Sequence, residues 1–423
     1  MRRTSAIAAF AAIAVAVVGC SSSSSTTGTG TTSSPAAGGN TIDIYSSLPL
    51  QAANIAQTVP TVNGMKLALA QAGGKAGQWT VNYQSLDDAT AATGKWDPGQ
   101  CAANARKAAS DPKTIIYLGE FNSGCSEVSI PILNEAGIPQ ISPANTYVGL
   151  TTGLPGSAPG EPQKYYPTGK RTYLRIVPID SIQGAADLIA MKNAGCTKVA
   201  VANDKEAYGG GLATLLELEK GFYGVTIVSN TGIDPTAPNF RSYASTIAGQ
   251  GADCFFFAGI TANGGVQIVK DVHTAIPTAK IFGADGVCTG AWVDPTKGGV
   301  PTSIDPLIQC TVATLDLSAY PGGKAFLAAY QAKYGVSSPD PYAIYGYAVM
   351  QLALNTIKSL GAQGNSKSAV LAALFATKAT PSVLGTFGFN ANGDTTLKSY
   401  GLYKVTNGQL VFYQTVTPTK TVS

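Results

Sequence analysis

Charged side chains are scarce in this chain of 423 residues, because they make up only 12% of the sequence, against roughly 25% in an ordinary soluble domain. Lys and Arg together outnumber Asp and Glu by 28 to 24. Two of the extra positive charges, Arg2 and Arg3, lie at the N-terminus. The remainder is therefore close to neutral and offers no basic stripe that would neutralise phosphates. We expect no nucleic-acid partner.

Histidine is almost absent, with His273 as the single example. One histidine excludes a multi-histidine metal site, and a Ser-His-Asp relay would have to use His273 itself. His273 lies in the middle of an expected helix without a nucleophile motif beside it. The sequence also lacks the G-x-S-x-G and G-x-x-x-x-G-K patterns. We therefore expect a protein that is not an enzyme and that holds no metal and no cofactor.

No apolar run reaches the roughly 18 residues that a membrane-spanning helix requires. The apolar stretch at 7–18 follows Arg2 and Arg3 and is typical of a signal peptide, which we expect at 1–19. It ends at Cys20 in the order Val-Val-Gly-Cys, which resembles the lipobox of bacterial lipoproteins, where the cysteine is acylated. The alternative is an ordinary secretory signal with an incidental cysteine.

Residues 20–41 are mostly Ser, Thr, Gly, Ala and Pro, a composition typical of a flexible linker. We expect an exported domain at the cell surface or in the periplasm, anchored to the membrane by lipidated Cys20. The other six cysteines are an even number in an exported chain, where disulfides persist, and six cysteines allow 15 pairings.

From residue 42 on, short apolar runs alternate with helical patterns, which predicts two doubly wound α/β lobes with parallel sheets. Asp97 before Pro98 is typical of a helix start, and Asn407-Gly408 between two apolar runs predicts a hairpin. We expect strands at 42–45, 79–83, 115–118, 138–141, 198–202, 225–228, 254–258 and 280–282. We expect helices over 64–72, 98–109, 126–135, 181 onward, 211–220, 239–248, 266–275, 324–334, 341–360 and 367–376.

A series of short segments, taken in order, resembles a known family. The segments are 64–69, 87–88, 136–143, 175–178, 183–184, 198–201, 207–209, 239–240, 251–253, 282–286 and 345–347. Together they resemble the type I periplasmic binding proteins of ABC transporters, and among these the group that binds Leu, Ile and Val. The resemblance extends over about residues 42–413.

The resemblance implies two lobes. The chain would cross from one lobe to the other three times, near Pro178, Leu317 and Ser382. The N-terminal lobe would comprise 42–177 and 318–382, and the C-terminal lobe 178–317 and 383–415. The ligand would lie between the lobes at the carboxyl ends of strands, and a hinge motion would close them around it. An ABC transporter permease is the implied partner, and a monomer is the implied state.

Asn122-Ser123-Gly124 follows a strand and opens a helix, so free N–H groups and the helix dipole favour an anion there. The resemblance implies that Ser123 binds the ligand carboxylate. It also implies that Ala144-Asn145-Thr146 contributes backbone groups and a threonine hydroxyl to ligand binding. It also implies that Tyr208 closes over the ligand and that Asp285 receives the ammonium. Each position has a structural alternative as a helix cap, a turn or a packing residue.

Two departures from the family stand out. Ile260-Thr261 replaces an aromatic residue that usually follows Gly259, which removes a contact to the ammonium. Residues 148–170 form a Pro- and Gly-rich insertion with Tyr165 and Tyr166. The sequence leaves open whether this insertion caps a larger ligand or is a variable surface loop.

The implied fold also reduces the number of possible disulfide pairings. In a lobe of strand order 2-1-3-4-5 the first and third strands are neighbours, which pairs Cys196 with Cys254. Cys288 and Cys310 would then join the fourth strand to the next segment. Cys101 and Cys125 remain, close to a bridge that is common in the family's first lobe.

We therefore expect a lipid-anchored solute-binding protein that delivers a small polar ligand, most simply a branched-chain amino acid, to an ABC permease. Two alternatives remain. One is a sensing receptor of the same fold, and the other is a ligand of the amide, urea or aromatic-acid type.

Overall fold

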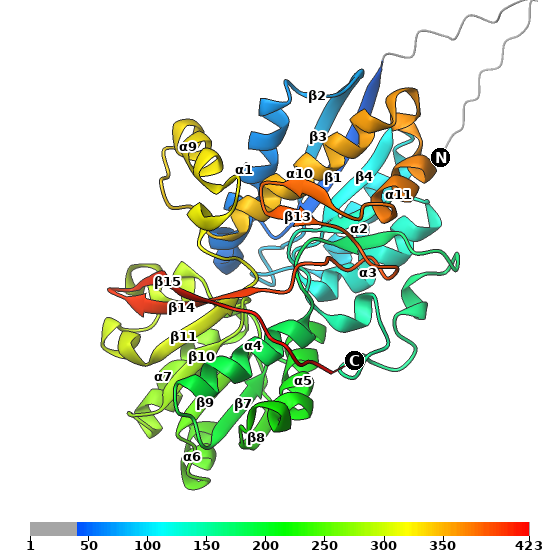
Figure 1. Ribbon diagram of the computed structural model, residues 1–423. Helices are drawn as coiled ribbons and strands as arrows, with labels where there is room; N and C mark the ends of the chain where they lie inside the picture. Colours follow the sequence, from blue (N-terminus) through cyan, green and yellow to red (C-terminus); the bar gives the residue numbers. More distant parts are fainter. Residues whose placement is uncertain (1–39, 423) are drawn as a thin grey trace, which may run out of the picture. The chain divides into compact units, whose positions relative to one another are not determined.

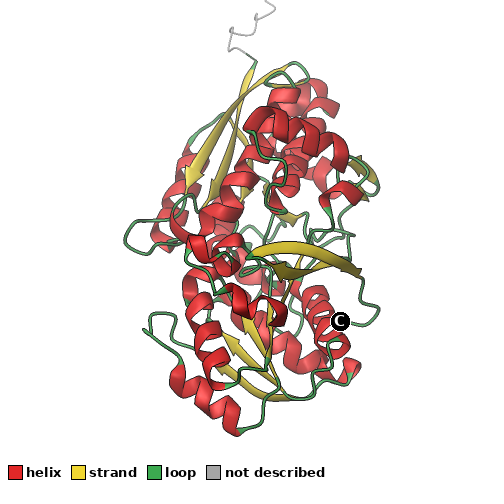
Figure 2. Cartoon of the chain, turned by 90° about the vertical axis from the view of Figure 1, so that its left-hand side faces the viewer, coloured by secondary structure: helices red, strands yellow, loops and turns green. Residues whose placement is uncertain are grey.

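Two sheets organise the part of the chain that the structure, a computed structural model, describes, which is residues 40–422 (Figure 1). Helices cover the faces of both sheets (Figure 2), as the doubly wound α/β pattern predicts. The expected signal peptide, the lipidation site Cys20 and the linker up to residue 39 lie outside the described residues. Among the described helices, none is long and apolar enough to cross a bilayer.

The first sheet has the order β2-β3-β1-β4-β5-β6, and all its strands are parallel except the short edge strand β2. Strand β1 is almost wholly buried, as expected for a strand covered on both faces, although Asp43, Ser46 and Ser47 are polar. The strands are β1 (Thr41–Leu48), β2 (Lys75–Ala76), β3 (Trp79–Asp87), β4 (Thr114–Gly119), β5 (Gln140–Ser142) and β6 (Tyr173–Arg175).

The second sheet has the order β15-β14-β11-β10-β9-β7-β8, in which β7 to β11 are parallel and the C-terminal hairpin is antiparallel. Asn407 and Gly408 form the hairpin turn, both with positive φ, as the Asn-Gly pattern predicts. The strands are β7 (Val199–Asn203), β8 (Ile227–Gly232), β9 (Cys254–Ala258), β10 (Lys280–Gly283), β11 (Ile308–Val312), β14 (Tyr400–Thr406) and β15 (Gln409–Val416).

The helices confirm the alternating pattern, although several begin earlier than expected. Asp97 caps α2 by accepting a hydrogen bond from the Gln100 amide at 3.0 Å. The helices are α1 (Ile55–Gln71), α2 (Pro98–Ser110), α3 (Ser123–Glu135), α4 (Asp180–Asn193), α5 (Ala207–Tyr223), α6 (Arg241–Gly249), α7 (Gly265–Ala275), α8 (Gly290–Val293), α9 (Gly323–Tyr334), α10 (Tyr342–Ser359) and α11 (Lys367–Phe375).

The chain passes between the two sheets three times: after β6, after β11, and between the hairpin β12–β13 (Thr380–Ser382 and Gly385–Phe387) and β14. After the second passage, α10 returns to pack along α1 beside the first sheet. We call the elements around the first sheet, with α1, α9, α10 and α11, the first lobe. The elements around the second sheet form the second lobe.

Two glycines allow α1 and α10 to lie in close contact. A Cβ added at Gly64 would collide with the backbone of Ala343, and one at Gly346 would collide with Thr61. Glycine is therefore required for this crossing, in spite of its cost in helix stability. The crossing fixes the N-terminal end of α10, and with it the position of Tyr342.

The six cysteines of the described chain form three disulfides, Cys101–Cys125, Cys196–Cys254 and Cys288–Cys310. These are the pairings that the implied fold predicts. Strand β7 pairs directly with β9, so the cysteines that precede or open these strands lie side by side.

The insertion at 148–170 is packed against the body of the protein. Tyr147, Val148, Tyr165 and Tyr166 are buried together with Leu215 of α5. The insertion does not line the cavity described below. The buried Glu161 accepts hydrogen bonds from the hydroxyls of Tyr147 and Tyr165 at 2.7 and 2.6 Å.

Candidate functional site

Six of the eight residues expected to bind a ligand line one cavity between the two lobes. Its walls come from the loops that follow β4, β5, β7, β9 and β10 and from α1. The lining residues are Gln57, Phe121, Asn122, Ser123, Ala144, Thr146, Glu206, Tyr208, Ile260, Asp285 and Gly286. The carboxyl ends of the parallel strands therefore build the site, as expected for open α/β sheets.

The N-terminus of α3 forms one side of the cavity. The helix begins at Ser123, so the amides of Ser123 and Gly124 have no carbonyl of a preceding turn to bond. The side-chain oxygen of Asn122 is buried without a hydrogen-bond partner. The two amides and the dipole of α3 suit a ligand carboxylate, whereas the Asn122 oxygen is an acceptor and needs a donor.

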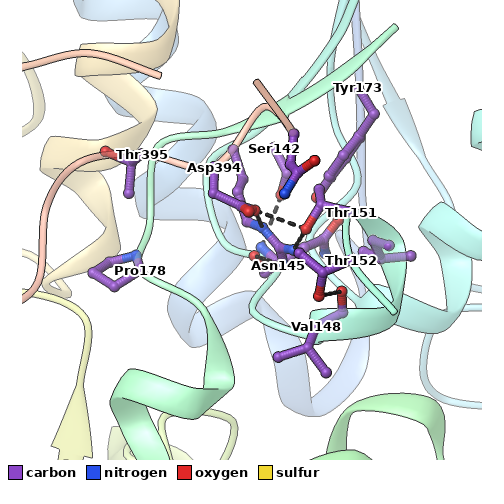
Figure 3. Close-up of polar contacts among 12 residues, drawn as sticks. Ser142, Asn145, Val148, Thr151, Thr152, Tyr173, Pro178, Asp394 and Thr395 are labelled. Atoms are coloured by element: carbon purple, nitrogen blue, oxygen red, sulfur yellow. Dashed lines mark hydrogen bonds and ion pairs between the residues drawn. The ribbon is translucent and has the colours of Figure 1, made fainter. Parts of the chain in front are cut away.

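Thr146 reaches the cavity from the turn after β5, and a buried arginine holds that turn. The Arg175 guanidinium donates to the backbone oxygens of Asn145 and Tyr147, on either side of Thr146, at 3.3 and 2.7 Å. The charge of Arg175 is compensated by Asp394 at 2.8 Å. Figure 3 shows Asp394 next to Thr151, whose hydroxyl donates to the same carboxylate at 2.8 Å. The backbone on either side of Thr146 is therefore held in place by Arg175.

Asn145 and Gly124 do not line the cavity. The side chain of Asn145 points into the first lobe, where its oxygen accepts from Tyr173 at 3.0 Å and its amide group donates to the Phe121 carbonyl at 2.8 Å. Gly124 faces the ring of Trp96, and a Cβ added there would lie 2.5 Å from that ring. Both residues shape the site from outside it.

Tyr208 and Asp285 meet on the second lobe. The Tyr208 hydroxyl donates to Asp285 Oδ1, and Asp285 is only 5% exposed. Burial raises the pKa of the Asp285 carboxyl, while the hydrogen bonds from Tyr208 and Tyr342 work in the opposite direction. A cation in the cavity would favour the ionised form of Asp285.

Two first-lobe residues that the sequence did not single out reach Asp285 across the cavity. Tyr342, at the start of α10, donates its hydroxyl to Asp285 Oδ2 at 2.5 Å. Gln57 of α1 donates to the Asp285 backbone oxygen at 3.0 Å. No local pattern marks either residue, because their positions depend on the return of the chain to the first lobe and on the α1–α10 crossing.

Apolar side chains also line the cavity. Ile260 lines the cavity at the position where the family has an aromatic residue, and Phe121 faces it from the first lobe. Phe121 packs edge-on against Tyr342, with 5.2 Å between the ring centres. Phe121 and Tyr342 thus provide an aromatic surface from the first lobe.

The cavity is narrow, with a volume of about 30 Å³, whereas ligand pockets are usually on the order of 300–1,000 Å³. We therefore expect a ligand to enter and leave by separation of the lobes. Among the described residues, the two clusters with metal-ligand spacing each contain two cysteines that are joined to each other in a disulfide. These cysteines have no thiolate to offer a metal ion.

Comparison with known proteins places this architecture in a family. The model of the periplasmic binding protein family matches residues 49–409, which is most of the chain. The chain therefore belongs to the periplasmic binding protein family, whose members bind solutes.

Individual relatives and solved structures are similar to this chain in sequence or in fold. The Leu/Ile/Val-binding protein BraC3 of Rhizobium johnstonii is 27% identical over 320 residues, which cover 74% of this chain and 79% of the relative. The crystal structure of the leucine-binding protein LivK of Thermotoga maritima is similar in fold, with a TM-score of 0.76 and 21% identity over 89% of this chain and 99% of that one. A solute-binding protein from R. palustris in complex with benzoate has a TM-score of 0.73 and 20% identity, over 89% and 97% of the two chains.

Proposed function

We propose that the protein captures an aliphatic α-amino acid, most simply a branched-chain one, in the cavity between the lobes and delivers it to an ABC permease. Ser123, Thr146 and the free amides of α3 bind the carboxylate, Asp285 binds the ammonium, and Tyr208 closes over the ligand. Binding brings the lobes together and involves no chemical step.

The observation that carries this proposal is the polarity of the cavity. The first-lobe wall offers uncharged donors at a helix N-terminus, the second-lobe wall offers a buried carboxylate, and Phe121 and Ile260 add apolar surface. A zwitterion with an apolar side chain matches all three parts. The printed names of the relatives, Leu/Ile/Val-binding and leucine-binding, support the same ligand class.

The remaining parts of the proposal follow from the sequence. The mature protein is a monomer, exported and held at the membrane by lipidated Cys20. Its first lobe comprises 42–177 and 318–394 rather than ending at 382 as the sequence implies, because β13 pairs with β12 and Asp394 pairs with Arg175 of β6. Its second lobe comprises 178–317 and 395–415, so three chain passages act as the hinge.

One observation favours a second candidate, an aromatic carboxylic acid. Both oxygens of Asp285 already accept hydrogen bonds from tyrosine hydroxyls, so this carboxylate is satisfied without an ammonium. An acid without an amine would still match the α3 end of the cavity, and the fold accommodates benzoate in the R. palustris protein.

Calorimetric titration with leucine, 4-methylpentanoate and benzoate distinguishes the two candidates. 4-Methylpentanoate is leucine without its ammonium group, so we expect leucine to bind and this acid to bind at least about 100-fold more weakly, as for removal of one partner of a buried charge pair. Asp285→Ala should weaken the binding of leucine by a similar factor. Glu217→Ala, which removes a half-buried carboxylate of α5 that pairs with Lys220, is the control and should leave binding unchanged. Tight binding of benzoate but not of leucine would overturn the amino-acid assignment.

A further inference from the structure

A loop of the first lobe, residues 88–97, reaches the second lobe at the edge of the cavity. Lys95 Nζ lies 2.6 Å from Glu206 Oε1 and 2.7 Å from the side-chain oxygen of Asn263. The Trp96 indole N–H donates to the other oxygen of Glu206 at 3.1 Å. Both carboxylate oxygens of Glu206 are therefore held from the opposite lobe.

The same loop covers the anion-binding end of the cavity. The ring of Trp96 lies against Gly124 in the first turn of α3, where a side chain would displace it. Glu206 itself lines the cavity with Ser123 and Tyr208. The loop thus packs against the first turn of α3, next to the cavity wall that contains Ser123 and Glu206.

The partners on the second lobe are held in place by one buried carboxylate. Asp204 accepts hydrogen bonds from the Glu206 amide at 3.1 Å and from the Asn263 side chain at 2.8 Å. Glu206 and Asn263 are therefore oriented toward the loop by their own lobe. Because these groups are positioned in advance, little ordering is needed when the loop binds them.

The charge of Glu206 gives Lys95 a second effect. A carboxylate beside a site for another carboxylate repels the ligand unless a cation compensates it. Lys95 and Glu206 are largely shielded from solvent, with side chains 25% and 15% exposed, so water screens this repulsion only partly. Lys95 therefore joins the lobes and also neutralises the wall of the anion site.

We propose that Lys95, Trp96 and Glu206 form an interlobe latch of positioning residues, which closes over the anion end of the cavity and strengthens the binding of every carboxylate ligand by the same factor. This inference rests on the proposed function. The hydrogen bonds of the latch go to Glu206 and Asn263 rather than to the apolar residues of the cavity, so it raises affinity without selecting among amino acids.

A double-mutant cycle tests the latch in the full-length protein. Lys95→Met leaves Glu206 uncompensated, and we expect it to weaken leucine and valine alike by about 10-fold to 30-fold, with a faster dissociation rate in stopped-flow measurements. Glu206→Gln removes the ion pair without leaving a charge, and its cost should be about 3-fold. The double variant should resemble Glu206→Gln and thus recover most of the loss.

Lys164→Met is the matched control, since Lys164 pairs with Glu161 at 2.9 Å within the insertion and away from the cavity. It should leave both affinities unchanged. The latch is overturned if Lys95→Met binds leucine with wild-type affinity. It is also overturned if the affinity loss of the double variant is the product of the two single losses, or if Lys95→Met weakens leucine and valine binding by different factors.

A second measurement keeps the latch testable if the wild type binds no amino acid, a result that would refute the proposed function alone. Small-angle scattering of the free proteins then reports lobe separation. A larger radius of gyration in Lys95→Met than in Lys164→Met supports the latch, and equal radii overturn it.

Discussion

The two walls of the cavity are built from different chemistry. The lining residues of the first lobe are Gln57, Phe121, Asn122, Ser123, Ala144 and Thr146, and none of these carries a charge. The second lobe contributes two carboxylates, Asp285 and Glu206, with Tyr208, Ile260 and Gly286. One wall therefore acts through oriented dipoles and hydroxyls, and the other through ionised groups.

This difference has a physical consequence. Backbone amides at a helix N-terminus keep their dipoles at every pH, and their orientation is fixed by the fold. A buried carboxylate gives a stronger contact to a cation, but only while it is ionised, and burial opposes its ionisation. We expect the first wall to set a constant affinity for the carboxylate and the second wall to make binding depend on pH.

The largest expected effect is this pH dependence. An ammonium in the cavity favours ionised Asp285, so below the raised pKa of Asp285 in the free protein a proton must leave before the ligand binds. The dissociation constant for leucine should then rise about tenfold for each unit that the pH falls below that pKa. It should be constant above that pKa, up to about pH 8. Titration calorimetry from pH 4 to pH 8 measures it.

Asp285→Asn is the control for this dependence, because other buried carboxyls lie near the cavity. Burial and the charge of Glu206 raise the pKa of Asp204 to about 6, and burial also raises the pKa of Asp180. Leucine binding by the Asn variant should be weak and nearly flat with pH. A wild-type slope that persists in the variant would assign the effect to Asp204 or Asp180 instead.

A smaller effect is expected where the two walls meet. Tyr342→Phe removes the first-lobe hydroxyl that donates to Asp285, and hydrogen bonds to charged groups contribute about 1.5–3 kcal/mol, so leucine should bind about 10-fold more weakly or worse. Tyr334→Phe is matched to it, since the Tyr334 hydroxyl donates to the Asn63 carbonyl at 2.9 Å within the first lobe. Equal affinities of the two variants, measured by calorimetry, would exclude a role for Tyr342 in positioning Asp285.

The smallest effect should come from a single donor of the first wall. Ser123→Ala removes one hydroxyl among several donors to the carboxylate, and we expect a loss of about 3-fold to 10-fold for leucine, close to 1 kcal/mol. The affinity for leucinamide, which lacks the carboxylate charge, should fall by a smaller factor. The ratio of the two losses isolates the contact between Ser123 and the carboxylate. If both ligands lose equally, Ser123 stabilises the cap of α3 rather than the ligand.

Local patterns explain why so much of the fold was predictable. Continuous apolar runs such as Cys254–Ala258 predict buried parallel strands, and the strand order that follows from the family resemblance brings the cysteines of β7 and β9 together. Six cavity residues were also found, because each directly follows a strand or opens a helix. Such positions lie at one edge of a sheet whatever the details of packing.

The rest of the site depends on contacts between distant segments. Gln57 and Tyr342 come from helices whose relative placement is set by the close crossing at Gly64 and Gly346. Lys95 and Trp96 lie in a loop without periodicity, and only the opposite lobe gives them partners. Asn145 follows a strand as Thr146 does, but hydrogen bonds inside the first lobe turn its side chain away from the cavity.

The three disulfides of the described chain share one property: each joins two segments of the same lobe, Cys101–Cys125 in the first and the other two in the second. Covalent cross-links therefore stiffen each half of the protein and place no restraint on the angle between the halves. An oxidising compartment can in this way stabilise both halves without reducing the range of their relative motion. The contacts that cross between the halves at the cavity, at Asp285 and at Glu206, are hydrogen bonds and one ion pair, all of which can break and form again in each cycle of binding and release.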